Sequence, residues 1–291
     1  CEYRLFGRDG RYRWFMTRAL PVRDETGRVV KWFGAAYDVD QQKLNEAALQ
    51  ALNGELNRFA FAAAHDLREP LRNIRGFTDL LVEHSSSPQP LLDERQLQKA
   101  RSVVTNSVER MDQLLADLLE YSVIGEGNGT AQEFESSSAL QKAIEHLSDT
   151  IARTGSEIVV GELPVIHARE SEIVSLFQNL IENAIKYRGP HAPRISISAT
   201  RRNGEWLFSV ADNGRGIENQ YAKHIFGIFK RLAGHEVPGT GIGLAIVEKI
   251  VTRYGGTIWV ESEVGQGSVF RFTWPLTGQL DSKLLGEVCE N

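Results

Sequence analysis

The chain has 291 residues, 42% of them hydrophobic and 24% charged, which is an ordinary globular composition and enough length for two or more domains. Its formal net charge of -5 argues against a general nucleic-acid-binding protein, because such proteins concentrate positive charge. Cys1 and Cys289 are too few for a disulfide framework or a thiolate zinc site, and no apolar run approaches the roughly 20 residues that cross a bilayer. The few cysteines favour a reducing, cytoplasmic compartment, and we expect neither a membrane segment in this chain nor a nucleic-acid partner. Because the chain starts at Cys1 and not at methionine, we expect a fragment, and membrane attachment of a longer parent stays open.

Residues 1–40 predict a small antiparallel sheet. The segments "EYRLF", "YRWFMTRALPV" and "VVKWFGAAYDV" are rich in aromatic and branched residues, and the turn signals "GRDG" and "RDETG" separate them. Three such strands form only part of a domain. Residues 41–58 then become helical and charged. Apolar residues alternate there at spacings of three and four, the pattern of a coiled coil: Leu49, Leu52, Leu56, Phe59 and Ala63.

A second amphipathic helix follows the loop "EHSSSPQPLLD". It continues the same pattern at Leu97, Val104, Val108, Met111, Leu115 and Leu118. Two helices of this kind cannot bury both apolar stripes against each other alone, whereas a homodimer converts two hairpins into a four-helix bundle. We predict such a dimer over residues 59–125. A monomeric hairpin packed on its own neighbours is the alternative.

After the flexible segment "IGEGNGTAQ", residues 126–276 alternate between helices and strands. We predict helices over 137–154, 171–187 and 243–255. The predicted strands are "EIVVG", "LPVIHA", "RISISAT", "EWLFSVA", "GTIWVESE" and "GSVFRFTWP". This order indicates an α+β layer in which helices cover one sheet. Residues 277–291 carry no clear signal and are treated as a tail.

Polar residues accompany the apolar face of the helix predicted over 171–187. Asn179, Asn183 and Lys186 fall in one stripe beside the expected core positions. Asparagine is a poor residue inside a helix, because its amide competes with the backbone for hydrogen bonds. Two of them one turn apart indicate a ligand, although a pair of solvated amides is the simpler alternative.

Two glycine-rich segments follow. In "ADNGRGIE", Asp212 ends a strand and precedes Gly214 and Gly216, an arrangement that a plain turn also explains. In "EVPGTGIGLAIV", glycines surround Thr240 at the start of a helix, where bare amides form an anion site. One such loop is weak evidence. The three motifs in this order indicate a nucleotide site.

The stretch "FAFAAAHDLREPLRNIRGF" places a nucleophile beside a carboxylate. A neutral His65 imidazole is nucleophilic near pH 7, and Asp66 can fix its tautomer and stabilise the positive charge that forms. Neighbours in a helix point about 100° apart, so their contact requires a favourable rotamer or local distortion. Pro70 supplies a cause of distortion, because it removes the hydrogen bond to the carbonyl of Asp66.

Together these motifs resemble those of sensor histidine kinases. "NLIENAIKYR", "DNGRGIE", "IFGIFKRL" and "GTGIGLAIV" are similar to the asparagine, glycine and phenylalanine boxes of that family. "HDLREPLR" is similar to its phosphoacceptor box, in the form found in PAS-linked and phytochrome-like members. The resemblance covers residues 59–275. Residues 1–40 are less specifically similar to the last strands of a PAS sensor domain.

The resemblance implies a multidomain α+β protein. Its parts are a partial PAS-like antiparallel sheet (1–40), a coiled-coil linker (41–58), a dimeric helical-hairpin phosphotransfer domain (59–125) and an α/β-sandwich ATP-binding domain (126–276). That last fold is shared with gyrase, mismatch-repair ATPases and heat-shock chaperones. The implied ligands are ATP and Mg²⁺. The implied nucleotide-binding residues, of which Asn183 would also hold Mg²⁺, are Asn179, Asn183, Lys186, Tyr187, Asp212, Gly214, Gly216, Lys230, Arg231, Gly239, Thr240, Gly241, Gly243 and Leu244.

The implied function is ATP-dependent autophosphorylation on His65, with Asp66 assisting. The phosphoryl group would then pass to an aspartate of a response regulator receiver domain, under control of an upstream PAS-type sensor. A catalytically silent dimeric nucleotide-binding scaffold and a gyrase-like ATPase are the alternatives. Asn179 disfavours the ATPase, because hydrolytic relatives carry glutamate there. Glu69 replaces the threonine or asparagine with which many members dephosphorylate their partner, so phosphatase activity stays open.

Overall fold

The computed structural model describes residues 1–8, 10–87, 92–125, 130–230 and 239–276. The chain divides into two compact units, Cys1–Ala64 and His65–Asn291. Within the described residues, every helix is too short or too polar to cross a lipid bilayer.

The first unit contains the predicted antiparallel sheet. Its strands β1 (Glu2–Phe6), β2 (Tyr12–Arg23) and β3 (Val29–Asp38) are hydrogen-bonded in the order β1-β2-β3. Large apolar side chains stay exposed on it, among them Leu20 at 73% and Trp32 at 62%. The described residues of this unit thus supply no second layer for the sheet, as expected for part of a domain.

One long helix, α1, follows the sheet. It extends over 47 residues, Asp40–Ser86, and continues through Pro70. Its start is attached to β2, because the amide of Trp14 donates to the Asp40 carboxylate (3.1 Å) and the amide of Val39 donates to the Trp14 carbonyl (2.8 Å). The predicted linker and the predicted phosphotransfer domain therefore share one continuous helix.

The second unit contains the remainder of α1 and helix α2 (Glu94–Val123). A capping box starts α2: the Asp93 carboxylate accepts from the Gln96 amide (2.8 Å), and the Gln96 side chain accepts from the Asp93 amide (2.9 Å). An ion pair between Arg110 and Glu69 (3.4 Å) connects the two helices.

Helix α2 has two apolar stripes. Ala100, Ser107 and Leu114 are buried within the chain. Two residues of the predicted dimer stripe remain exposed, Val108 at 43% and Leu115 at 46%, and so do Leu119 and Val123. The single chain thus leaves part of the predicted stripe uncovered.

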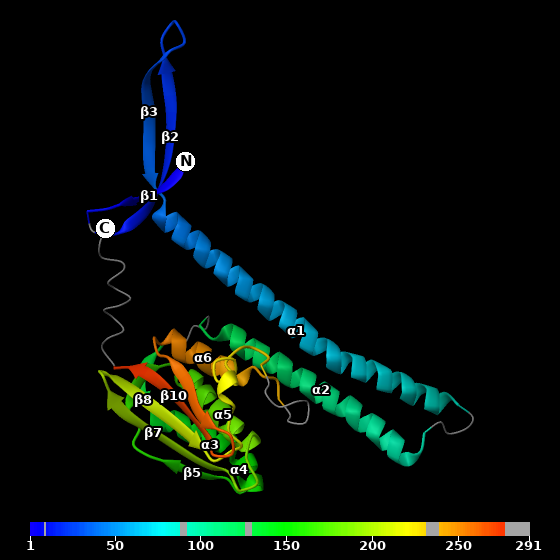
Figure 1. The fold of residues 1–291 in the computed structure, drawn as a ribbon. Coiled ribbons are helices and arrows are strands. Elements are labelled where there is room, and N and C mark those ends of the chain that lie inside the picture. The colour runs from blue at the N-terminus through cyan, green and yellow to red at the C-terminus, as the bar shows by residue number, and fades with distance from the viewer. Residues whose placement is uncertain (9, 88–91, 126–129, 231–238, 277–291) are drawn as a thin grey trace. The chain divides into compact units, whose positions relative to one another are not determined.

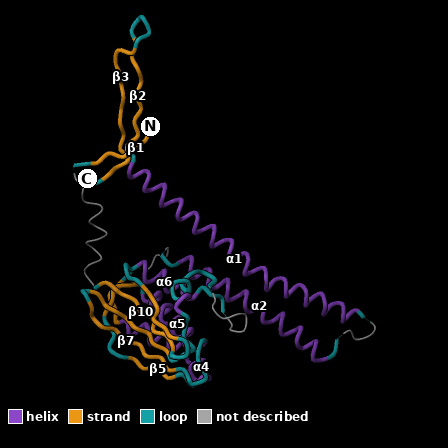
Figure 2. Tube along the Cα trace, in the orientation of Figure 1, coloured by secondary structure: helices purple, strands orange, loops and turns teal. Residues whose placement is uncertain are grey.

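The rest of the second unit is a sheet with helices on one face (Figures 1 and 2). The sheet order is β5-β7-β8-β10-β9, in which only the β5–β7 pair is parallel. Strands β4 and β6 form a separate antiparallel pair. The strands are β4 (Gln132–Glu135), β5 (Glu157–Val160), β6 (Val165–Ala168), β7 (Arg194–Arg202), β8 (Glu205–Asp212), β9 (Ile258–Glu263) and β10 (Gly267–Pro275). The helices are α3 (Ser136–His146), α4 (Ser148–Thr154), α5 (Glu170–Lys186), η1 (Asn219–Tyr221) and α6 (Gly243–Arg253).

The core lies between this sheet and its helices. On β10, Phe270, Phe272 and Trp274 are buried at alternate positions, because successive strand residues point to opposite faces. The ring of Phe272 stacks on Phe208 of β8, with centroids 4.8 Å apart. Helix α5 packs its apolar stripe into the same core, including Phe177, which is 1% exposed. The twofold repeat of the strands and the 3.6-residue repeat of the helix thus place the apolar side chains of both on the faces that pack together.

Two elements of this domain differ from the sequence-based expectation. The helix predicted over 137–154 is two helices, because Leu147 leaves helical geometry (φ −98°, ψ 6°) and turns its buried side chain into the core. Strand β4 is an additional element that the sequence patterns do not indicate. It pairs with β6, about thirty residues further along the chain, and so it has no local turn signal.

Candidate functional site

A cavity of about 720 Å³ opens at one end of the α/β domain, within the usual size of ligand pockets. Most of the predicted nucleotide residues line it: Asn179, Asn183, Lys186, Tyr187, Asp212, Gly216, Lys230, Gly239, Thr240, Gly241, Gly243 and Leu244. Gly214 adjoins Asp212 behind the lining. Arg231 lies outside the described residues.

Helix α5 supplies the first wall. Its polar stripe places Asn179, Asn183 and Lys186 on the cavity, each half-buried beside the apolar stripe. The side-chain amide of Asn179 donates through Nδ2 to the Ser175 carbonyl (3.0 Å). Its Oδ1 therefore remains as an acceptor on the cavity side of the helix, close to Gly243.

Asp212, at the end of β8, supplies the second wall. Its Oδ1 accepts from the backbone amides of Gly214 (2.8 Å) and Ser268 (3.2 Å). Burial raises the pKa of Asp212 above its ordinary value, and these two hydrogen bonds oppose the rise. Because both backbone amides donate to Oδ1, the other carboxylate oxygen, Oδ2, can accept a hydrogen bond from a ligand. Gly216 (φ 72°) must be glycine, because a Cβ there would collide with the Glu263 carbonyl.

The glycine loop and the start of α6 supply the third wall. No side chain of the described residues caps α6, so its first amides keep their hydrogen-bonding capacity. The loop approaches α5 so closely that a Cβ on Gly243 would collide with Oδ1 of Asn179. A helix start with bare amides on a cavity is a site for a phosphate or another anion.

Several cavity residues were not among the predicted nucleotide-binding residues. Glu182, Arg215, Tyr221 and Phe270 line the cavity, and the Arg215 guanidinium lies 5.7 Å from the Tyr187 ring centroid. Two more, Gln113 and Asp117, come from α2. Glu182 and Arg215 stand within the motifs "NLIENAIKYR" and "DNGRGIE", which could have indicated them. Long-range packing brings Gln113 and Asp117 to the cavity, and nothing local in the sequence indicates these two.

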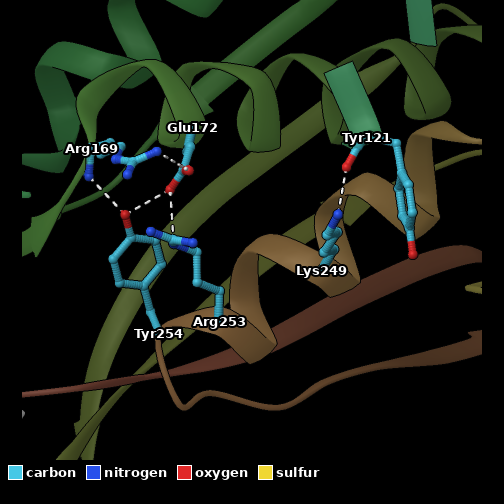
Figure 3. A network of polar contacts seen from close by, with 6 residues as sticks. All are labelled: Tyr121, Arg169, Glu172, Lys249, Arg253 and Tyr254. Atoms are coloured by element: carbon cyan, nitrogen blue, oxygen red, sulfur yellow. Dashed lines mark hydrogen bonds and ion pairs between the residues drawn. The ribbon is translucent and has the colours of Figure 1, made fainter. Parts of the chain in front are cut away.

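A polar network connects the first turn of α5 with the end of α6 (Figure 3). Glu172 is 8% exposed and accepts from the Tyr254 hydroxyl (2.6 Å), while Arg169 (3.4 Å) and Arg253 (3.8 Å) approach its carboxylate. Tyr254 in turn accepts from the Arg169 amide (2.9 Å). Burial, and next the Glu172 carboxylate, raise the pKa of Tyr254, so its phenol stays protonated as a donor.

His65 lies on α1, and its side chain is 71% exposed. Its Nδ1 is 3.0 Å from Oδ1 of Asp66, so the predicted contact between helical neighbours is present. Nε2 is then left for reaction. Neither residue belongs to the cavity lining among the described residues. Glu69, one turn further, pairs with Arg110 of α2 instead of standing free beside the histidine.

The described residues contain no cluster of three or more histidine, cysteine, aspartate or glutamate side chains able to hold a metal ion. The cavity instead offers the amide oxygen of Asn183, with Asn179 and Glu182 near it on the same helix. Mg²⁺ prefers oxygen ligands and is usually shared between one or two side chains, waters and substrate phosphates. The residues present therefore fit a magnesium ion that arrives with a nucleotide.

The second unit thus combines an α/β layer that carries a cavity of ligand size with a helix that exposes a histidine beside a carboxylate. The comparisons agree. Residues 168–278 match the family described as histidine kinase-, DNA gyrase B- and HSP90-like ATPase, residues 55–127 match the His Kinase A phospho-acceptor domain, and residues 1–36 match the PAS fold. The chain belongs to the sensor histidine kinases.

Among its relatives is cyanobacterial phytochrome A of Nostoc sp., 42% identical over 247 residues, which cover 84% of this chain and 31% of the relative. The chain thus spans about a third of that protein. A histidine kinase ThkA structure, in complex with response regulator protein TrrA, has a TM-score of 0.62 at 23% identity, over 96% of this chain and 79% of that one. Full-length ShkA in complex with AMPPNP has a TM-score of 0.50 at 26% identity, over 75% of this chain and 45% of that one.

Proposed function

We propose that the chain autophosphorylates His65 with ATP as donor. One observation carries the proposal: the asparagine helix, Asp212 and the glycine loop, which are separated in sequence, converge on one cavity of nucleotide size. Asp212 accepts from the adenine amino group, and the α6 amides receive phosphate oxygens. The ShkA structure is a complex with AMPPNP, which carries the same adenine amino group as ATP, and it supports this ligand by analogy.

Asn183 would hold Mg²⁺ through its amide oxygen, with Asn179 close by on the same helix. The ion, when bound, neutralises charge on the transferring phosphate. Lys186 and Lys230, which line the cavity, add positive charge along the phosphates. Asn179 carries an amide instead of a carboxylate and cannot serve as a base, so water attack in this cavity is slow.

His65 supplies the nucleophile. The Asp66 carboxylate accepts a hydrogen bond from Nδ1–H and fixes the tautomer in which Nε2 is unprotonated. Nε2 forms a bond to the γ-phosphorus as the bond to the bridging oxygen breaks, and ADP leaves. Asp66 stabilises the positive charge on the ring. Because His65 lies outside the cavity lining, the ATP-binding domain moves relative to α1 in each cycle.

The phosphoryl group then passes from His65 to an aspartate of a separate response regulator. The ThkA structure is a complex with such a regulator, which supports this partner by analogy of fold. Control comes from the PAS-type unit through α1, whose first turn is bonded to β2. Insertions within residues 42–56 test this control. Seven inserted residues preserve the heptad phase and two do not, so only the two-residue insertion should change the autophosphorylation rate. Equal rates would contradict it.

The functional form is a homodimer. Val108, Leu115, Leu119 and Val123 form an exposed apolar stripe on α2, which a second copy would bury in a four-helix bundle. We expect Leu119→Glu to convert a dimer to a monomer, measured as a halving of mass by light scattering. Asn106→Glu, at an exposed position on another face of α2, is the matched control and should stay dimeric. A monomeric parent chain would contradict the proposal.

Labelling tests the function directly. Incubation with magnesium and γ-phosphate-labelled ATP should give one labelled histidine, located at His65 by mass spectrometry. The label should resist base and be lost in acid. Steady phosphate release without protein labelling would favour the gyrase-like ATPase. Nucleotide binding with neither labelling nor phosphate release would favour the silent scaffold.

Asp212→Asn should weaken ATP binding about 10- to 100-fold, because the amide nitrogen cannot accept from the adenine amino group. A pH series gives a second readout. ATP requires the ionised carboxylate, so the affinity of the parent chain should fall as pH drops through the raised pKa of Asp212, above the ordinary 3.8. Calorimetry measures both effects. The variant should lack this acid dependence, and an equal dependence in both proteins would contradict the role of Asp212.

A further inference from the structure

The last three turns of α2 contact the ATP-binding domain along one face of the helix. Leu114 and Ile124, at the two ends of this face, are buried in the core of that domain at 1% and 7% exposure. Asp117, Glu120 and Tyr121 lie between them at helical spacing. We call Leu114, Asp117, Glu120, Tyr121 and Ile124 the docking face.

Three polar contacts of the docking face reach elements that build the nucleotide cavity. The Thr240 hydroxyl, in the glycine loop, donates to Oδ2 of Asp117. The Ser175 hydroxyl, one turn before Asn179 on α5, donates to Glu120.

Lys249 makes the third contact, from α6. Its Nζ donates to the Tyr121 carbonyl (2.6 Å) at the C-terminal end of α2 and lies 4.2 Å from the Tyr121 ring centroid (Figure 3). A cation at a helix C-terminus is favourable, because it meets the unpaired carbonyls there.

Asp117 is also part of the cavity lining, beside the glycine loop and the start of α6. Gln113 donates to its Oδ1 (2.6 Å) and Thr240 to its Oδ2, so the carboxylate is held in this position. The glycine loop is where the proposed function puts phosphate. A fixed carboxylate there repels a triphosphate, and it also occupies the Thr240 hydroxyl, which could otherwise donate to phosphate.

We propose that the docking face is an autoinhibitory contact in which Asp117 competes with the triphosphate of ATP for the glycine loop. This inference rests on the proposed nucleotide site. Docked α2 and phosphate exclude each other, so nucleotide binding releases the ATP-binding domain from α2. The released domain is then free to move to His65. By thermodynamic reciprocity, docking lowers nucleotide affinity by the factor by which nucleotide weakens docking.

Two variants of the whole chain distinguish the effect of the Asp117 charge from the effect of the docking contact itself. Asp117→Asn keeps a side chain that can accept from Thr240 but removes the charge. Lys249→Met removes the contact with Tyr121, and Lys249 is not among the cavity residues. We expect each to tighten binding of magnesium–AMPPNP about fivefold or more by calorimetry. Asp112→Asn, an exposed residue on the same helix, makes the same charge change and should leave affinity unaltered.

Adenosine is the ligand control, because it fills the cavity without phosphates. Its affinity should be equal in the parent chain and in both variants. Hydrogen exchange provides an independent readout: AMPPNP should accelerate exchange of the last-turn amides of α2 in the parent chain. Unchanged or weaker AMPPNP binding in Asp117→Asn would overturn the inference, and so would slower exchange. A parent chain that binds neither AMPPNP nor adenosine would instead refute the nucleotide site itself.

Discussion

Replacing His65 with glutamine is expected to reduce phosphoryl incorporation from ATP by at least about 10³-fold, to background. Glutamine keeps a polar side chain of similar size but has no nucleophilic nitrogen, so the covalent step is lost. The histidine is 71% exposed and outside the nucleotide cavity, so the affinity for AMPPNP should not change. Labelling measures the first quantity and calorimetry the second.

His84 provides the matched control on the same helix. It is a second α1 histidine, and His84→Gln removes an imidazole that accepts from the Leu92 amide (3.1 Å) without touching the cavity. The His84 variant should retain labelling. Residual label in the His65 variant, at any other side chain, would show that the phosphoacceptor has been assigned wrongly.

Glu172→Ala is expected to lower the free energy of unfolding of the ATP-binding domain by about 3 kcal/mol. The carboxylate is buried, and its removal takes away the acceptor of the Tyr254 hydroxyl and one charged partner of Arg169. Desolvated groups without partners are costly, whereas the apolar neighbours change little. Hydrogen exchange of the α5 amides in the whole chain measures the loss, because those amides report opening of this domain.

Glu170→Ala tests whether burial causes that loss. Glu170 is the first residue of the same helix and pairs with Lys142 (2.7 Å) at the surface. Exposed ion pairs contribute at most about 1 kcal/mol, so this variant should lose much less stability. Equal losses in the two variants would mean that the buried network adds nothing beyond a surface pair.

Much of the cavity could be predicted because its residues occur in short local motifs. Asn179, Asn183 and Lys186 share one helix face, so periodicity alone aligned them. The glycine loop was recognisable from residues that tolerate close approach, as at Gly243. The sheet was equally predictable, since buried and exposed residues alternate along β7 and β10.

The features that escaped prediction depend on contacts between distant segments. Asp117 is 123 residues from Thr240 in the chain, and nothing local to either indicates their hydrogen bond. Strand β4 likewise forms only because β6 offers it an edge. The contact of His65 with Asp66 depends on a side-chain rotamer, which helical periodicity does not specify. The periodicity of a helix determines which of its residues share a face, but which other segment packs on that face depends on the tertiary structure.

The uncapped start of α6 has a consequence for how this protein can evolve. A serine or aspartate at Ile242 would cap the first amides of α6, worth about 1 kcal/mol, but it would also replace a fully buried core side chain, which costs more than the cap contributes. The same side chain would occupy the position that an incoming anion needs. Selection for heat resistance should therefore improve other parts of the domain and leave this weakness in place, a trade between durability and activity.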